Sequence, residues 1–345
     1  MGSWEGKVVH SCIKMAVSDF YSRYRTRVQL HFRDTGADSL LATAAAIDLL
    51  ENVEVVAIIV PTITNKELFL AKLSDTANVP LLSFSSISAS DIEHPYFFQV
   101  AEDETAQFHA IASFFRASKW TNCAILYEDT ADARRVQSYL YDILHESRVN
   151  VASQIAISPK ATDDKMIVRE LHKLKSSVIV VHMSPSLASQ TLVHAKKLGM
   201  MSKGYAWIMT SKAMNSLDLH DSLIHESMEG VIGFRSLPLF YASTKSRGFA
   251  LRWRKELIRL YEPDTEIKEL NVVGVQAYDA VWALADAIER AEMKPQKKKV
   301  QVKVLDLGRL WISNSGAALS SEISRSKFIG LGGEFLENEY GRPMK

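Results

Sequence analysis

The stretch VVAIIV at residues 55–60 is continuously apolar, and VIVV at residues 178–181 repeats that character in the second half of the chain. A strand that is apolar on both faces is covered on both faces, which is typical of a parallel sheet between two layers of helices. The two stretches therefore predict parallel sheets in both halves of the chain.

Strand-length apolar blocks alternate with helical patterns on either side of these stretches. The predicted strands are residues 26–32, 53–60, 80–84, 96–100, 122–127, 151–157, 178–182, 205–209 and 231–234. One helix is predicted at residues 5–24, and Ser184 with Pro185 opens another that Gly199 closes. The apolar face of a further helix is formed by Phe249, Trp253, Leu257, Leu260 and Tyr261. This alternation predicts an α/β fold with doubly wound, mainly parallel sheets.

The amino terminus departs from the usual order of a doubly wound sheet. Such a sheet begins with a buried central strand, whereas this chain passes from a short polar loop directly into a helix. We therefore expect the first strand to be missing. Near the other end, the basic stretch at residues 294–310 is interpreted as a surface loop, with a nucleic-acid or phospholipid patch as the alternative.

Length and composition are those of an ordinary globular protein with about two domains. The chain has 345 residues, of which 47% are hydrophobic and 23% charged, and its formal net charge is +1. Nucleic-acid and membrane-surface proteins usually show a field of one sign, so a neutral chain argues against both classes. No apolar run approaches the roughly 18 residues that cross a bilayer, and the first residues contain no secretory signal. Taken alone, these features predict a soluble intracellular protein.

The usual signatures of catalysis and metal binding do not occur in the sequence. His145-Glu146 and His225-Glu226 each lack the second histidine of a zinc-binding helix, and there is no G-x-S-x-G nucleophile elbow. Cys12 and Cys123 are too far apart for a Cys-x-x-Cys site, and their apolar surroundings indicate buried small hydrophobes. We expect no enzyme, no metal site and no cofactor.

Polar residues at the ends of predicted strands are the candidates for ligand binding, because open α/β sheets bind ligands there. After residues 55–60 come Thr62 and Thr64, and Thr64 with Glu67 forms a capping box at a helix start that can hold a carboxylate. An ordinary helix cap is the alternative interpretation. Ser85 and Ser86 follow the next strand and offer hydroxyl groups, although a plain polar loop is the alternative.

Tyr127, Glu128 and Asp129 end a strand in the second half of the chain. Their carboxylates are placed to face a cationic group of a ligand. A role of Asp129 as a helix N-cap is the alternative.

Six further segments are informative when taken together and in order: MAVSDFYSRY at 15–24, PLLSFSS at 80–86, PYFFQV at 95–100, AKKLGMMSKGYAWIMTS at 195–211, MEGVIGFR at 228–235 and AYDAVWALADAIERA at 277–291. These segments resemble the amino-terminal domain of plant glutamate receptor-like ion channels. The resemblance covers nearly the whole chain and implies the type I periplasmic-binding-protein fold, a bilobed clamshell. It implies lobe 1 at residues 1–99 and 236–328 and lobe 2 at 100–235 and 329–345, with crossings near Gln99, Arg235 and Phe328.

The resemblance also implies functions for individual positions. Thr64 matches the hydroxyl that holds a ligand's α-carboxylate in related amino-acid receptors, and Ser85 and Ser86 match a loop that holds the α-amino and carboxylate groups. The departures from the family pattern are Val60 for glycine, Ile87 for threonine, Asp132-Ala133 for Tyr-Gly, and Ser211-Lys212 for Asp-Trp. A missing carboxylate at Ser211 removes a partner for a ligand ammonium, and Lys212 adds a like charge.

Members of this family are tetrameric cation channels of the plasma membrane with this domain on the extracellular side. The resemblance therefore implies a truncated receptor chain that senses a small amino-acid-like ligand or assembles with other subunits through lobe 1. Two alternatives stay open: an oligomerisation module with an empty cleft, and a non-functional fragment from a misannotated gene model. Loss of a central strand favours the latter, since it exposes the hydrogen-bonding edges of its neighbours.

Overall fold

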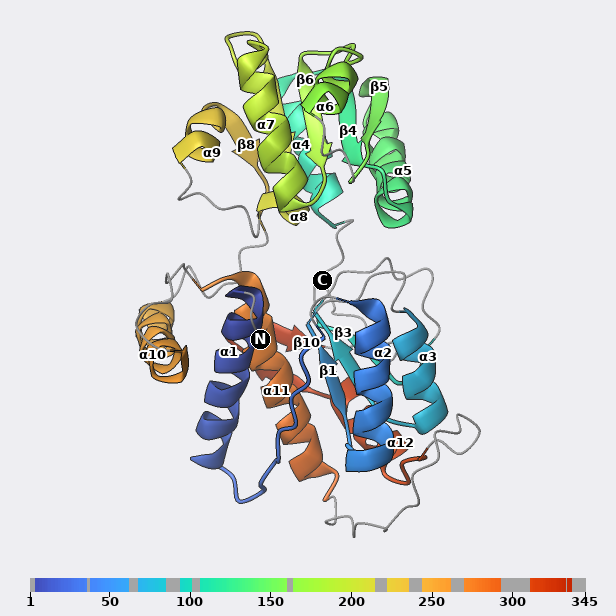
Figure 1. Cartoon of the computed structure of the whole chain (residues 1–345), viewed down its shortest axis with the longest axis vertical. Coiled ribbons are helices and arrows are strands. Elements are labelled where there is room, and N and C mark those ends of the chain that lie inside the picture. The colour runs from blue at the N-terminus through green and yellow to red at the C-terminus, as the bar shows by residue number, and fades with distance from the viewer. Residues whose placement is uncertain are drawn as a thin grey trace. The chain divides into compact units, whose positions relative to one another are not determined.

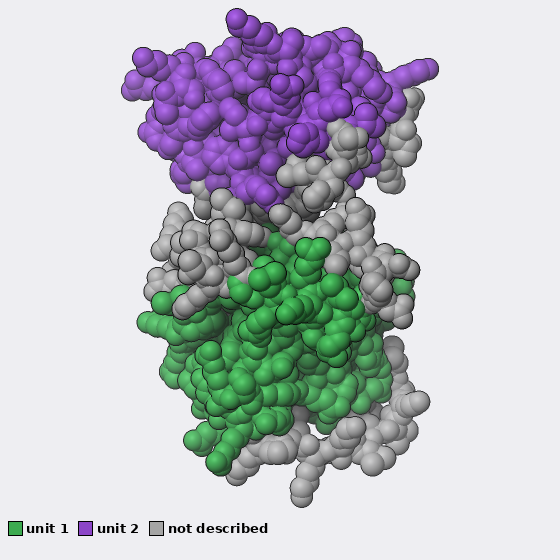
Figure 2. Space-filling model, turned by 90° about the vertical axis from the view of Figure 1, so that its left-hand side faces the viewer, with its two compact units in different colours: residues 1–103, 237–345 green, residues 104–236 purple. Residues whose placement is uncertain are grey.

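The computed structural model describes residues 4–35, 38–61, 68–84, 94–100, 106–159, 164–214, 222–235, 244–261, 270–292, 311–332 and 334–336. The chain divides into two units, unit 1 at residues 1–103 and 237–345 and unit 2 at residues 104–236 (Figure 2). Each unit contains its own parallel sheet and its own helices (Figure 1).

Unit 1 is formed by two separated parts of the chain. Its first part contains α1 (Trp4–Tyr21), α2 (Ser39–Asp48), the short π-helix η1 (Leu49–Val53), β1 (Ile58–Val60), α3 (Leu68–Ala77), β2 (Leu81–Ser83) and β3 (Phe97–Gln99). Its second part contains α10 (Thr244–Tyr261), α11 (Val272–Arg290), α12 (Gly316–Ser324), β9 (Lys327–Ile329) and β10 (Glu334–Leu336). Strands β1, β2 and β3 pair in parallel in that order, and β9 pairs with β10 antiparallel.

The parallel sheet of unit 1 is covered by helices on both faces. Leu82 and Phe98 belong to one core cluster, which they share with residues of α1, α10 and α11. The neighbouring Leu81 and Phe97 belong to a second cluster, which they share with residues of α2 and α3. Successive side chains of a strand point to opposite faces, so this division places the two helical layers on opposite sides of the sheet. Helices α1 and α11, far apart in sequence, lie side by side (Figure 1).

Two polar contacts anchor the carboxyl-terminal part of unit 1. The carboxylate of Asp279 in α11 accepts hydrogen bonds from the backbone N–H groups of Leu331 and Gly332, both at 2.7 Å. Residues 329–345, expected in lobe 2 from the resemblance, fall in unit 1 by the division seen in the structure. The other division points, after residues 103 and 236, lie close to the predicted crossings at Gln99 and Arg235.

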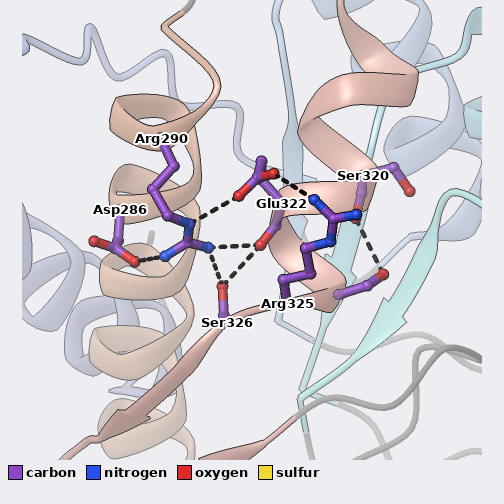
Figure 3. A network of polar contacts seen from close by, with 7 residues as sticks. Asp286, Arg290, Ser320, Glu322, Arg325 and Ser326 are labelled. Carbon is purple, nitrogen blue, oxygen red and sulfur yellow. Dashed lines mark hydrogen bonds and ion pairs between the residues drawn. The ribbon is translucent and has the colours of Figure 1, made fainter.

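Arg290, at the end of α11, joins this helix to α12 through a network of charged groups (Figure 3). Its guanidinium pairs with Asp286 one turn earlier and donates to Glu322 of α12 at 2.9 Å and to Ser326 at 3.1 Å. Arg325 pairs with the other oxygen of Glu322 at 3.2 Å. Glu322 is therefore shared by two cations, which holds its pKa below the ordinary value.

Unit 2 is a doubly wound domain with a five-stranded parallel sheet in the order β5-β4-β6-β7-β8. Its elements are α4 (Ala106–Ser118), β4 (Asn122–Glu128), α5 (Ala131–Glu146), β5 (Asn150–Ile157), α6 (Asp164–Leu171), β6 (Val178–His182), α7 (Pro185–Lys197), β7 (Ala206–Met209), α8 (Ser211–Met214), α9 (Ser222–Ser227) and β8 (Val231–Gly233). Ala124 and Leu126 pack with residues of α6 and α7, whereas Cys123 and Ile125 pack with residues of α4 and α5. The prediction of doubly wound, parallel sheets is confirmed.

Two strand predictions in unit 1 are wrong in whole or in part. The structure assigns no ladder to residues 26–32; Val28, Leu30 and Phe32 pack against the core while the residues between them are exposed. This alternation explains the sequence pattern without a strand partner. Of the predicted strand at 53–60, the strand itself is Ile58–Val60, because the preceding helix continues as η1 to Val53. The two cysteines are buried and free, as predicted.

Candidate functional site

Half of the predicted ligand-binding residues lie outside the described part of the chain. These are Thr62, Thr64, Ser85 and Ser86, which follow β1 and β2 in unit 1. Their assignment to a ligand's carboxylate and amino group stays a prediction. The departures at Ile87 and Asp132 also concern positions whose side chains are not described, so the part of the site that can be built is in unit 2.

The carboxyl ends of β4, β6 and β7 gather polar residues at one edge of the unit 2 sheet. Parallel pairing places Tyr127 of β4 opposite His182 of β6, so the residues that follow both strands emerge at the same edge. Thr210 follows β7, and its backbone N–H donates to the carbonyl of Val181 at 3.1 Å. The structure therefore brings Tyr127, Glu128 and Asp129 to the same edge of the sheet as Ser211.

Glu128 is the last residue of β4, and only 8% of its surface is exposed. Its Oε2 accepts a hydrogen bond from the backbone N–H of Ser184 at 2.8 Å. Ser184 is the N-cap of α7, and its own hydroxyl makes no capping bond. The carboxylate thus supplies the partner and the negative charge that the first turn of α7 needs.

Asp129 is paired with Arg134 in the first turn of the following helix, α5. Its Oδ1 accepts from Nε of Arg134 and lies beside the second guanidinium nitrogen, both at 2.7 Å. The alternative N-cap role of Asp129 is wrong, because Thr130 is the N-cap of α5 and its Oγ1 accepts from the backbone N–H of Ala133. Both carboxylates at the end of β4 are therefore engaged by partners within unit 2.

His182 and Thr210 form a buried pair that is not among the predicted site residues. Both are fully buried, and Nδ1 of His182 lies 3.0 Å from Oγ1 of Thr210. Burial, reinforced by the nearby ammonium of Lys212, lowers the pKa of His182 to about 3. The imidazole is thus neutral at physiological pH. A polar residue directly after the apolar VIVV was the signal that could have identified it.

Ser211 begins the short helix α8 and is buried, with 7% of its surface exposed. Its backbone N–H donates to Oε1 of Gln107 in α4 at 2.7 Å. The amide nitrogen of Gln107, Nε2, is buried and has no hydrogen-bond partner within the described residues. This amide is a donor that an oxygen atom of a ligand can satisfy.

At this edge of the unit 2 sheet the two carboxylates are already paired, and the other groups are neutral or cationic. Its acidic groups are occupied by Ser184 and Arg134, its imidazole is neutral, and Lys212 adds a positive charge. A group of three or more possible metal ligands does not occur among the described side chains. Within the described residues, Nε2 of Gln107 is an unpaired hydrogen-bond donor at this edge.

Comparison with known protein families shows to which family the chain belongs. Residues 8–345 match the family model described as the receptor family ligand binding region. The chain belongs to this family. It is a family of receptor ligand-binding domains, which are typically non-enzymatic.

Similar curated proteins are glutamate receptors of Arabidopsis thaliana. Glutamate receptor 1.2 is 35% identical over 344 residues, covering 97% of this chain and 37% of that protein. Glutamate receptor 2.7 is 34% identical over 345 residues, covering 95% of this chain and 35% of that protein. The chain thus spans a little over a third of the length of these relatives.

A solved structure shares the fold at low sequence identity. It is a solute-binding protein of an ABC transporter from Rhodopseudomonas palustris BisB5, solved in complex with 3,4-dihydroxybenzoic acid. The TM-score is 0.75 at 15% identity, over 98% of this chain and 86% of that chain. The resemblance to periplasmic binding proteins is confirmed for the fold. Within the described residues, the helices are too short or too polar to traverse a membrane.

Proposed function

We propose that this receptor ligand-binding region is the extracellular ligand-sensing domain of a glutamate receptor-like, ligand-gated cation channel of the plasma membrane. The observation that carries the proposal is the family match over residues 8–345, together with about 35% identity to Arabidopsis glutamate receptors. Binding is proposed to act by shifting the population between two arrangements of the domain, without making or breaking a covalent bond.

The ligand class we propose is a small, amino-acid-like molecule. The hydroxyls at Thr62, Thr64, Ser85 and Ser86 are proposed to hold its carboxylate and amino group, as the resemblance implies. In unit 2, considered by itself, the unsatisfied Nε2 of Gln107 is a donor for an oxygen atom of a ligand. Glu128 and Asp129 are not proposed as partners of a ligand ammonium, because Ser184 and Arg134 already engage them.

Isothermal titration of the chain with single amino acids and with matched organic acids that lack the amino group tests the proposal. We expect saturable heat with one class of compound and a concentration-dependent rise in melting temperature, since a ligand that binds the native state stabilises it. Absence of both heat and thermal shift with every compound would rule out the sensing role for these ligand classes.

A variant that restores the family pattern sharpens the test. In Ser211→Asp with Lys212→Trp, a carboxylate replaces the buried hydroxyl of Ser211 and the neighbouring ammonium is removed. We expect this double variant to bind amino acids at least about tenfold more tightly than the native chain, since a charge-assisted contact to an ammonium contributes on the order of 1.5–3 kcal/mol. The organic acids without an amino group are the control and are expected to gain nothing.

Assembly with other subunits is a second candidate function, favoured by an apolar surface on unit 1. Leu40 and Leu41 in the first turn of α2 are 76% and 55% exposed, and Phe69 of the neighbouring helix α3 is 47% exposed. Large apolar side chains that are exposed on adjacent helices are typical of protein interfaces. We propose a further copy of this domain as the partner of this surface.

Light scattering coupled to size exclusion tests assembly. The native chain is expected to form a concentration-dependent dimer that Leu40→Glu with Leu41→Glu converts to a monomer. Leu251→Glu with Ile258→Glu, at the exposed residues of α10, is the matched control and is expected to keep the dimer. A native chain that stays monomeric at all concentrations would exclude self-assembly by this surface.

A further inference from the structure

A cavity of about 560 Å³ lies in unit 1 between α1, α10 and the extended segment that contains Leu30. From α1 it is lined by Lys14, Ser18 and Tyr21, which are spaced four and three residues apart and so share one face of the helix. All of these elements belong to unit 1, and the residues that carry the strand-end site of unit 2 take no part. The cavity is of a size that holds a small organic molecule.

Helix α10 contributes the other wall, also from one helical face. Arg252, Lys255, Glu256 and Arg259 follow the spacing of three, four and seven residues that aligns side chains along a helix. Together with Lys14, this face places four cationic groups and one carboxylate around the cavity. The surrounding field is therefore positive.

Two of the four cations are already compensated. Arg259 donates to both oxygens of Glu256, at 2.8 and 2.6 Å, and this contact is the main reason that the pKa of Glu256 is lowered. Arg252 pairs with Asp19, whose second oxygen accepts from the hydroxyl of Tyr278 at 2.8 Å.

The other two cations are Lys14 and Lys255, and neither ammonium forms an ion pair within the described part of the chain. Lys14 acts on Glu256 only at longer range, as a minor cause of its lowered pKa. After internal pairing, the cavity thus keeps an excess of two positive charges, contributed by opposite walls.

The floor of the cavity is apolar. Met15 and Val17 of α1 are buried, with 5% and 7% of their surfaces exposed, and the partly buried Leu30 lines the cavity from the extended segment. Tyr21 is held in place by Val28, because its hydroxyl accepts from the backbone N–H of Val28 at 2.9 Å and donates to the carbonyl of the same residue. An apolar floor below two uncompensated ammonium groups matches a molecule with an apolar body and two anionic groups.

We propose that this cavity binds a small organic dianion, with Lys14 and Lys255 contacting its two charged groups and Met15, Val17 and Leu30 contacting its apolar body. Among the described residues, none of the strand-end residues of the proposed sensing function lines this cavity. Charge attraction draws the ligand in, and the apolar contact distinguishes it from inorganic anions.

Titration calorimetry with phthalate, benzoate and sulfate separates these contributions. Phthalate has the apolar ring and two charges, benzoate has the same ring with one charge, and sulfate has two charges without the ring. We expect phthalate to bind most tightly, with an affinity that falls as the salt concentration rises, because exposed charge contacts are screened.

Lys14→Glu with Lys255→Glu locates the site. This variant is expected to weaken phthalate binding at least about tenfold, because both attractive charges become repulsive. Lys72→Glu with Lys327→Glu, which makes the same charge change at two exposed lysines of unit 1, is the matched control and is expected to leave the affinity within about twofold. Circular dichroism and thermal melting of both variants establish that each is folded.

Three outcomes would overturn the proposal. They are an equal loss of affinity in both double variants, equal affinities for phthalate, benzoate and sulfate, and no measurable phthalate binding by the native chain. The first would indicate a general effect of net charge, and the second would exclude recognition of both the second charge and the ring.

Discussion

Glu128 and Ser184 connect the end of β4 to the start of α7 through a single hydrogen bond of 2.8 Å, from the backbone N–H of Ser184 to Oε2 of Glu128. The carboxylate is buried at the edge where a ligand group would otherwise approach it. A residue that sequence spacing selects for ligand binding is therefore part of the scaffold. Substitution of Glu128 can therefore distinguish a structural role of this carboxylate from a role in ligand binding.

Glu128→Gln is expected to lower the free energy of unfolding by about 0.5–1 kcal/mol, because the amide oxygen still accepts from Ser184 but the charge at the start of α7 is lost. Glu128→Ala removes the acceptor as well and is expected to cost about 1–3 kcal/mol. Urea unfolding monitored by circular dichroism measures both. Glu146→Gln, at an exposed position of α5, is the control and should stay within about 0.5 kcal/mol of the native chain.

A Glu128→Gln variant that keeps full stability but loses amino-acid binding would contradict this assignment. It would show that the ligand, and not α7, is the partner of the carboxylate.

Two glycines of unit 1 give opposite predictions for the same substitution. A Cβ atom at Gly330 would lie 2.5 Å from the carboxyl carbon of the buried Asp279, so Gly330→Ala is expected to cost about 1–3 kcal/mol. At Gly248, inside α10, a Cβ atom would meet nothing within 4 Å. Gly248→Ala is expected to stabilise the chain by about 0.5–1 kcal/mol, because alanine is the better helix former.

Thermal melting of the two variants, side by side, measures this difference in sign. Equal effects would mean that the loop at residues 330–332 is not held against Asp279.

The fold was predictable because its signals are local and strong. The strand VIVV and the helix between Ser184 and Gly199 are found within two residues of their predicted ends, and Gly199 adopts a φ of +72° immediately after that helix, a conformation that favours glycine. The segment at 26–32 was predicted wrongly because alternation reports which side chains are buried and does not report whether a neighbouring backbone is in reach.

The site was less predictable, because its geometry depends on which polar groups pair with one another. Their position at the end of a strand correctly predicts that Glu128 and Asp129 lie at the edge of the sheet. It does not predict their partners Ser184 and Arg134, which belong to later parts of the chain. His182 was not selected because no short motif contains it. Its neutral state follows from burial beside Thr210, an arrangement that exists only in the folded chain.

Asp279 is expected to make unit 1 more stable at mildly acidic pH. Burial raises the pKa of this carboxyl to about 6, against its ordinary value near 3.8, although the N–H groups of Leu331 and Gly332 oppose the shift. The folded state therefore holds the proton more tightly than the unfolded state. The contribution is fully present below about pH 3.8 and is lost as the pH rises through about 6, by about 1–1.5 kcal/mol between pH 5 and pH 7.

Asp279→Asn removes this titration. Urea unfolding at a series of pH values should show that the variant loses about 1–1.5 kcal/mol more stability than the native chain between pH 7 and pH 5, whereas Asp142→Asn, at an exposed carboxylate, keeps the native pH dependence. The substitution also places an amide –NH₂ against one of the two backbone donors, so a pH-independent loss of about 1–3 kcal/mol is expected in addition. If the stability of Asp279→Asn changes with pH in the same way as that of the native chain, ionisation of Asp279 does not contribute to the pH dependence.

His182 is expected to act in the opposite direction in unit 2. Its pKa of about 3 lies below the ordinary value of 6.5, so the unfolded state takes up the proton first as the pH falls. The stability of unit 2 is then full above about pH 6.5 and falls by about 2 kcal/mol between pH 7 and pH 5. Because Asp279 and His182 change with opposite signs over the same pH range, the native chain as a whole is expected to show a smaller dependence than either group alone.

His182→Gln should therefore flatten the loss of stability on acidification that remains in the Asp279→Asn background. The comparison is with His145→Gln, which removes an exposed histidine of α5 and separates the effect of burial from the removal of an imidazole. Measuring the change with pH, and not the stability at one pH, keeps the test independent of any constant cost of losing the contact to Thr210. If both histidine variants show the same pH dependence in that background, the imidazole of His182 is not held neutral by the fold.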